Sequence, residues 1–112
     1  MSRRPGRPSE AGFQVLMTLS EGERHGYAIM RELAVGGVRM GPGTLYGAVK
    51  RLIEQHWIEE VATGDSDPRR RTYRLTDSGR AVLRSEAERL ALMVDYATRT
   101  GALPSKDGGV SA

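Results

Sequence analysis

The stretch GPGTLYGAVKRLIEQHWIEE, residues 41–60, decides the fold because it predicts one helix followed directly by one strand. Its apolar residues recur at the spacing of a single helix face, and they are Leu45, Val49, Leu52 and Ile53. Residues 41–44, Gly-Pro-Gly-Thr, open the helix. Residues 57–61 are apolar at both ends and predict the strand.

Two shorter helices are expected before this stretch. Ser9 can cap the first helix, which should end near the polar residues 20–23. The second helix should start near His25 and end at the glycine pair 36–37, since glycine commonly follows a helix C-terminus. Residues 38–40 fit either a short strand or a turn. The second and third helices would then form a helix-turn-helix.

A returning strand and one long helix are expected after it. Residues 71–75 alternate in polarity, so they predict a strand that pairs with residues 57–61 across a long, charged loop. Thr76 can cap a helix that should run to about Thr100, where Gly101 stops it.

The fold class is therefore expected to be mainly α with a small β-hairpin, a winged helix-turn-helix plus a long C-terminal dimerisation helix. Residues 1–8 should form a flexible basic arm and residues 9–75 the DNA-binding domain. Residues 76–101 should form the dimerisation helix and residues 102–112 a disordered tail.

This order of elements points to double-stranded DNA, because a winged helix places its third helix in the major groove. On the outward face of that helix, Tyr46 and Lys50 lie one turn apart and Gly43 allows close approach. Arg51 also falls on this side. The wing carries a cluster of guanidinium groups suited to phosphates or a narrow minor groove, and these belong to Arg69, Arg70 and Arg71.

Composition narrows the function classes. The chain has 112 residues, enough for one domain, and a net charge of +3. Arginine makes up all of its basic residues except Lys50 and Lys106, which suits nucleic acid and equally fits the codon usage of a GC-rich genome. There is no cysteine and no apolar run long enough to span a membrane. We expect a cytoplasmic, nucleoid-associated protein that is no enzyme and has no metal or cofactor.

Three motifs together resemble the PadR family of transcriptional regulators. They are His25-Gly26-Tyr27, then Gly41 to Tyr46 (GPGTLY), then Tyr73 to Thr76 (YRLT), and Gly79 falls where the family has a glycine early in its last helix. The resemblance covers residues 13–79 and fits the short branch with a single C-terminal helix. It implies a homodimeric repressor of the winged-helix type, many members of which a small molecule releases from DNA.

The resemblance implies that the residues at the family's DNA-contacting positions also contact DNA in this chain. These are Tyr27, Thr44, Tyr46, Lys50 and the wing arginines. Tyr73 could instead pack inside the hairpin. Some short-branch proteins bind flat aromatic drugs between tryptophans of the last helix, but here no tryptophan follows Trp57. Trp57 itself could serve as core packing, lie close to a dimer contact or line a ligand cavity.

The last helix carries a heptad seam that suits a partner helix, namely Leu83, Ala87, Leu90, Val94 and Ala97. The same face could instead cover its own domain. A dimer would bring two recognition helices to successive major grooves, so its operator should be a pseudo-palindrome.

Two further interpretations stay open. Four acidic residues near the wing would also suit a winged-helix protein–protein interaction module without DNA binding, namely Glu59, Glu60, Asp65 and Asp67. The basic segment 3–8 is close to the Arg-Gly-Arg-Pro element of minor-groove arms, and it also fits a simple flexible arm.

Overall fold

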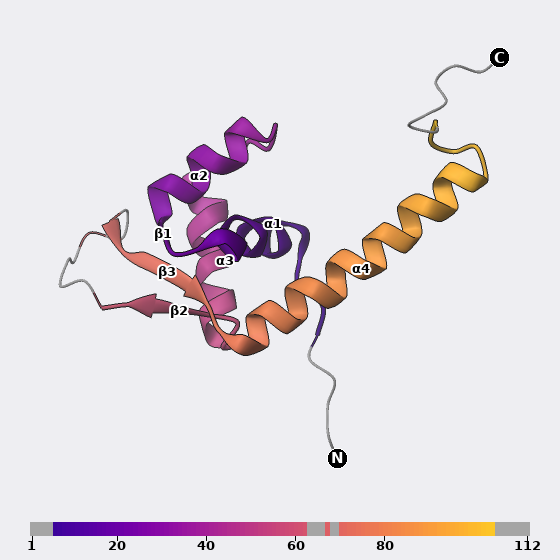
Figure 1. Ribbon diagram of the computed structural model, residues 1–112. Helices are drawn as coiled ribbons and strands as arrows, with labels where there is room; N and C mark the ends of the chain where they lie inside the picture. Colours follow the sequence, from indigo (N-terminus) through magenta and orange to yellow (C-terminus); the bar gives the residue numbers. More distant parts are fainter. Residues whose placement is uncertain (1–5, 63–66, 68–69, 105–112) are drawn as a thin grey trace.

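The computed structural model describes residues 6–62, 67 and 70–104. Within them lie the helices α1 (Glu10–Thr18), α2 (Gly26–Val35), α3 (Pro42–Glu54) and α4 (Asp77–Arg99), the short 3-10 turn η1 (Leu19–Glu21), and the strands β1 (Arg24–His25), β2 (Ile58–Val61) and β3 (Thr72–Leu75). Figure 1 shows α1, α2 and α3 gathered beside the sheet, while α4 extends away from them. The mainly helical winged-helix fold expected from the sequence is confirmed.

Parts of three predicted segments lie outside the described residues. These are residues 1–5 of the arm, residues 105–112 of the tail, and Arg69 in the wing.

The helix ends agree with the capping residues read from the sequence. The Ser9 hydroxyl accepts a hydrogen bond from the Gly12 N–H at 3.0 Å, and the Thr76 hydroxyl accepts one from the Gly79 N–H at 3.0 Å. Gly36 follows the last residue of α2, and Gly37 takes a positive φ of 88° just beyond it. Residues 38–40 form no strand and lead directly into α3.

The sheet has one strand more than the predicted hairpin. Strand β3 lies between β1 and β2, and both pairings are antiparallel. The pair β2–β3 is the predicted hairpin, with Ile58 opposite Leu75 and Val61 opposite Thr72. Strand β1 has only two residues, too few to show the alternation that reveals a strand in a sequence.

The core lies where α1, α2 and α3 meet the inner face of the sheet. Leu45, Val49 and Leu52 are buried as the spacing in α3 predicts, and Ile53 packs at the edge of the core. Trp57 and Tyr73 are also buried, at 4% and 3% exposed. Tyr73 therefore packs inside the hairpin, which is the alternative to a DNA contact for this residue.

A close contact fixes the start of α4 against the turn after α3. A Cβ atom on Gly79 would lie 1.8 Å from the Trp57 carbonyl oxygen, so no larger residue fits here. The Thr76 N–H donates to that same oxygen at 3.1 Å, and the Thr76 hydroxyl donates to the His56 carbonyl at 2.6 Å. The direction in which α4 leaves the domain is therefore set by its first turn.

The two halves of α4 have different surroundings. Val82 and Leu83 in the first half pack against the core of their own domain. In the second half, large apolar side chains are more than half exposed, namely Leu92, Met93, Val94 and Tyr96. In the described part of the chain, no helix combines the length and apolar character needed to cross a membrane.

Candidate nucleic-acid interface

The outward face of α3 is open to solvent near its N-terminus. Gly43 and Thr44 are exposed, and a Cβ atom at Gly43 or at Gly47 would meet no other atom within 4 Å. Lys50 and Arg51 are exposed further along the same helix. This face therefore has small residues in the N-terminal turns of α3 and cations in the turns that follow. Small side chains allow another molecule to approach the helix backbone closely.

Tyr46 departs from the outward position that the sequence predicts. Its side chain packs against Gly26 of α2, where an added Cβ would lie 2.8 Å from the tyrosine hydroxyl oxygen. This hydroxyl is buried. Tyr46 lies at the border between the inner and outer faces of α3, and the absence of a side chain at Gly26 lets the ring turn inward. It contributes to the joint between the two helices.

The base of the wing is held against the start of α2 by a histidine. The Nδ1 atom of His25 lies 2.9 Å from the Arg70 carbonyl oxygen and 3.0 Å from the Thr72 hydroxyl. The Gly26 N–H donates to the Arg71 carbonyl at 3.2 Å. His25 precedes α2 but makes no side-chain cap for it. Its ring instead holds the wing strand beside the helix-turn-helix.

Two of the predicted wing arginines fall within the described residues, and their surroundings differ. Arg70 is exposed. The Arg71 side chain is 39% exposed, and its guanidinium lies 3.8 Å from the Glu60 carboxylate. Part of the positive charge of Arg71 is therefore balanced inside the hairpin.

Lys50 and Arg71 border the same hollow, of about 550 Å³, between α3 and the hairpin. Tyr46, Tyr73 and the carboxylates of Glu60 and Asp67 also line it. Burial, followed by the nearby Glu60 charge, raises the pKa of Tyr73, so its hydroxyl stays neutral. The helix face and the wing base thus form one continuous surface.

The carboxylates near the wing pair with cations of the sheet. Glu59 stands opposite Arg74 in the register, and their carboxylate and guanidinium groups are 2.7 Å apart. Glu23 also reaches Arg74, at 3.6 Å. Glu59 and Glu60, two of the acidic residues that suggested a protein-interaction module, therefore both have arginine partners within the fold. Asp65 lies outside the described residues.

Two arginines that the sequence did not single out, Arg31 and Arg39, lie near the start of α3. Arg31 follows Tyr27 by one turn of α2, and its guanidinium carbon is 5.8 Å from the centre of the exposed Tyr27 ring. Arg31 and Arg39 line a second hollow, of about 500 Å³, next to Gly41. The spacing of four residues between Tyr27 and Arg31 is a signal that the sequence already contains.

The predicted dimerisation residues do not all lie on one free surface. Leu83 packs on its own domain, and Leu90 and Ala97 are half-buried. Ala87 and Val94 are exposed. The described residues hold no group of three or more side chains suited to bind a metal ion.

The fold and this surface define a winged helix-turn-helix protein. The chain belongs to the PadR-like family of transcriptional regulators, whose family model matches residues 15–85. This confirms the family resemblance seen in the three sequence motifs.

Individual relatives agree with this family. The chain is 33% identical over 78 residues to the transcriptional regulator Rv3488 of Mycobacterium tuberculosis, a match that covers 70% of this chain and 73% of that protein. It is 38% identical over 86 residues to an uncharacterized 37.1 kDa protein in transposon TN4556 of Streptomyces fradiae. That match covers 76% of this chain but 24% of the transposon protein, so this chain spans about a quarter of its length.

A solved structure shows the same architecture. The PadR family transcriptional regulator from Eggerthella lenta is 28% identical and superposes with a TM-score of 0.67, over 80% of this chain and 81% of that one.

Proposed function

We propose that this chain is a sequence-specific DNA-binding transcriptional regulator that acts as a repressor. One observation carries the proposal, namely that the exposed face of α3 and the base of the wing border the same hollow, with Lys50 on one side and Arg71 on the other. A major groove admits one helix, and its two phosphate walls then meet the cations on either side.

The contacts follow from this docking. Gly43, Thr44 and Gly47 face the groove floor, and Lys50 and Arg51 reach bases or phosphates along it. Tyr27, stacked with Arg31, meets the neighbouring phosphates at the start of α2, where the helix dipole favours an anion. Arg70 and Arg71, with Arg69 beyond the described residues, contact the backbone or the minor groove beside the site.

A homodimer is proposed on the second half of α4. Met93 and Val94, beside the seam residues Leu90 and Ala97, are 55% and 53% exposed, and a helix that projects such apolar surface into water is stabilised by a partner. A second copy supplies the same surface by symmetry. The operator is then a pseudo-palindrome with half-sites about 34 Å apart.

The dimer is tested by the mass of the protein in solution at micromolar concentration. Val94→Glu should shift it to a monomer, because a charge would be buried in the interface. Glu88→Ala changes an exposed residue of the same helix and should leave the dimer intact. A monomeric native protein would overturn this part of the proposal.

DNA binding is tested by fluorescence anisotropy with the DNA upstream of the protein's own gene, beside a scrambled duplex of equal length. We expect preference for the native duplex and a steep loss with salt, about 0.9 log units per phosphate contact for each tenfold rise. Lys50→Ala and the pair Arg70→Ala, Arg71→Ala should each weaken binding.

Arg84→Ala is the matched control, since it removes one positive charge from α4, away from the hollow that Lys50 and Arg71 border. It should leave affinity within about twofold. If the wing and Lys50 variants behave like Arg84→Ala on every duplex tested, a protein-interaction role replaces DNA binding. Release from DNA by a small-molecule effector stays a prediction of the family resemblance.

A further inference from the structure

The imidazole of His25 lies between two parts of the proposed DNA surface. Tyr27 is the second residue of α2, and the Arg70 carbonyl in the wing is joined to the ring by a hydrogen bond. Figure 1 shows β1, which contains His25, between the start of α2 and the wing end of β3. His25, Tyr27 and Arg70 are all exposed. A phosphate that met both the start of α2 and the wing would therefore pass close to this ring.

One nitrogen of the ring is already bound to the protein. Nδ1 lies 2.9 Å from the Arg70 carbonyl oxygen and 3.0 Å from the Thr72 hydroxyl. A carbonyl oxygen only accepts hydrogen bonds, so these contacts assign the proton of the neutral ring to Nδ1. The other nitrogen, Nε2, then has a lone pair and no proton. Among the described residues, Nε2 has no hydrogen-bond partner.

Nε2 can bind a phosphate only after it takes up a proton. Phosphate oxygens accept hydrogen bonds, so a neutral His25 has nothing to donate to them from this side of the ring. The protonated ring donates from both nitrogens and carries a positive charge. It can therefore keep its bond to the wing and at the same time make a charge-assisted bond to a phosphate.

Cations lie on the segments beside the ring, and the carboxylates there pair elsewhere. The cations are Arg24 of β1, Arg70 and Arg71 at the base of the wing, and Lys50 of α3. The carboxylates are those of Glu21, Glu23, Glu32, Glu60 and Asp67, and within the described part of the chain none of them pairs with the His25 ring. From α3, the Tyr46 hydroxyl packs against Gly26. Since no described carboxylate neutralises the ring, the anion that stabilises its protonated form must come from outside.

We propose that His25 contacts a DNA phosphate through Nε2 and takes up one proton when DNA binds. The bond from Nδ1 to the wing already fixes the ring, so the contact costs little further side-chain entropy. Histidine is the side chain whose charge ordinarily changes between pH 5 and 8, so a fall in pH over this range favours the DNA-bound state. This inference rests on the proposed function, because its partner is DNA.

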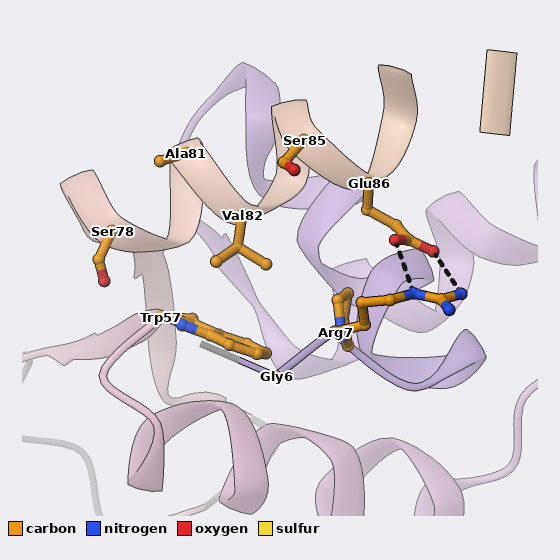
Figure 2. A pocket seen from close by; sticks show the side chains of 9 residues that line it. Gly6, Arg7, Trp57, Ser78, Ala81, Val82, Ser85 and Glu86 are labelled. Atoms are coloured by element: carbon orange, nitrogen blue, oxygen red, sulfur yellow. Dashed lines mark hydrogen bonds and ion pairs between the residues drawn. The ribbon is translucent and has the colours of Figure 1, made fainter. Parts of the chain in front are cut away.

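Few other groups change charge over this pH range. The chain has two histidines and no cysteine, and the second histidine is His56, in the turn between α3 and β2. Burial raises the pKa of Tyr73. Hydrogen bonds from Arg89 and then from Arg7 lower the pKa of the buried Glu86 carboxylate to about 2, and Figure 2 shows Arg7 reaching it. The N-terminal amine titrates in this range, but it is the same in every variant.

The first measurement needs no DNA. Long-range proton–nitrogen NMR spectra of the full chain at pH 8 distinguish the two neutral forms of each imidazole, and comparison with His25→Asn identifies the signals of His25. We expect its proton on Nδ1. A neutral ring with its proton on Nε2 would overturn the proposal, because that nitrogen could donate to a phosphate without taking up a proton.

The second measurement follows DNA binding by anisotropy at pH 5.5 and pH 8, with the upstream duplex and the scrambled one. Relative to His25→Asn, the native chain should gain about five- to tenfold in affinity at the lower pH on both duplexes. Asparagine keeps a side-chain N–H near the position of Nδ1, so the wing stays anchored while Nε2 and its charge are removed. At pH 5.5, the salt dependence of the native chain should be steeper by about 0.9 log units for each tenfold rise.

His56→Asn is the matched control, since it removes the other histidine, and asparagine tolerates the positive φ of 63° at this position. It should keep the native pH dependence. Equal pH profiles and equal salt slopes for the native chain and His25→Asn would overturn this contact and leave the DNA-binding proposal standing. If neither duplex binds at either pH, the proposed function fails, and this contact fails with it.

Discussion

Replacing Gly79 by alanine should strongly destabilise the protein, because a methyl group has no room there. The added Cβ would lie 1.8 Å from the carbonyl oxygen and 2.7 Å from the carbonyl carbon of Trp57, both backbone atoms that no rotamer change can move away. An ordinary carbon–oxygen contact is about 3.3 Å, so the start of α4 must retreat by about 1.5 Å.

That retreat acts on the hydrogen bonds that fix the joint. Thr76 donates from its N–H to Trp57 at 3.1 Å and from its hydroxyl to His56 at 2.6 Å. Each such bond contributes about 1 kcal/mol net, and overpacking adds about 1–3 kcal/mol of strain. The free energy of unfolding should therefore fall by about 3–5 kcal/mol if both bonds are lost, a large part of the stability of a chain this size.

The assay is urea unfolding followed by Trp57 fluorescence, at one fixed protein concentration because dimerisation would couple to folding. Gly47→Ala is the matched control, since its added Cβ would have no atom within 4 Å. If Gly79→Ala unfolds at the same urea concentration as the native protein, α4 is not fixed at this joint and the reasoning is wrong.

Three other perturbations have expected outcomes. Gly47→Ala should raise the free energy of unfolding by up to about 1 kcal/mol through helix propensity yet weaken DNA binding in anisotropy, since the methyl group stands on the proposed groove-facing surface. His56→Gly should raise the free energy of unfolding, measured in urea, by about 1 kcal/mol, because His56 has a φ of 63° that is unfavourable for any residue with a Cβ atom. His56→Ala keeps the Cβ atom and should give no such gain. The pKa of Glu86 falls from 4.5 to about 2 on folding, so the stability that its carboxylate contributes is complete above pH 4.5 and is lost as the pH falls toward 2. The urea midpoint of Glu86→Gln should therefore lose this pH dependence, whereas that of Glu88→Gln should keep it.

Each of these has an outcome that contradicts it. Unchanged DNA affinity in Gly47→Ala would mean that DNA does not approach α3 closely at this point. A gain from His56→Ala equal to that from His56→Gly would assign the effect to the imidazole and not to the backbone. The same acid profile in Glu86→Gln and the native protein would place the acid-sensitive group elsewhere.

The helices and the hairpin could be predicted because their signals are local. Ser9 and Thr76 both cap a helix in the sequence and in the structure. The apolar spacing in α3 identified its buried face. These features depend on residues two to four apart, which a sequence displays directly.

What could not be predicted depends on contacts between distant residues. Arg7 and Glu86 are 79 residues apart, and no pattern in the sequence around either residue shows that their side chains meet. Tyr46 was expected to point outward. It packs inward because Gly26, on another helix, has no side chain in the way, and the spacing within α3 does not show this. Strand β1 exists only because the base of the wing lies beside it.

The residues of the predicted heptad seam in α4 have two different environments along the helix. Leu83 uses its apolar side chain on its own core, whereas Val94, about three turns later, is exposed. The change from one environment to the other falls near Glu86, the buried carboxylate that Arg7 and Arg89 hold. This carboxylate lies where α4 passes from the domain to the proposed dimer contact. A change in the tilt of α4 at this point would alter the spacing of two recognition helices, which is how a molecule far from DNA could control its binding.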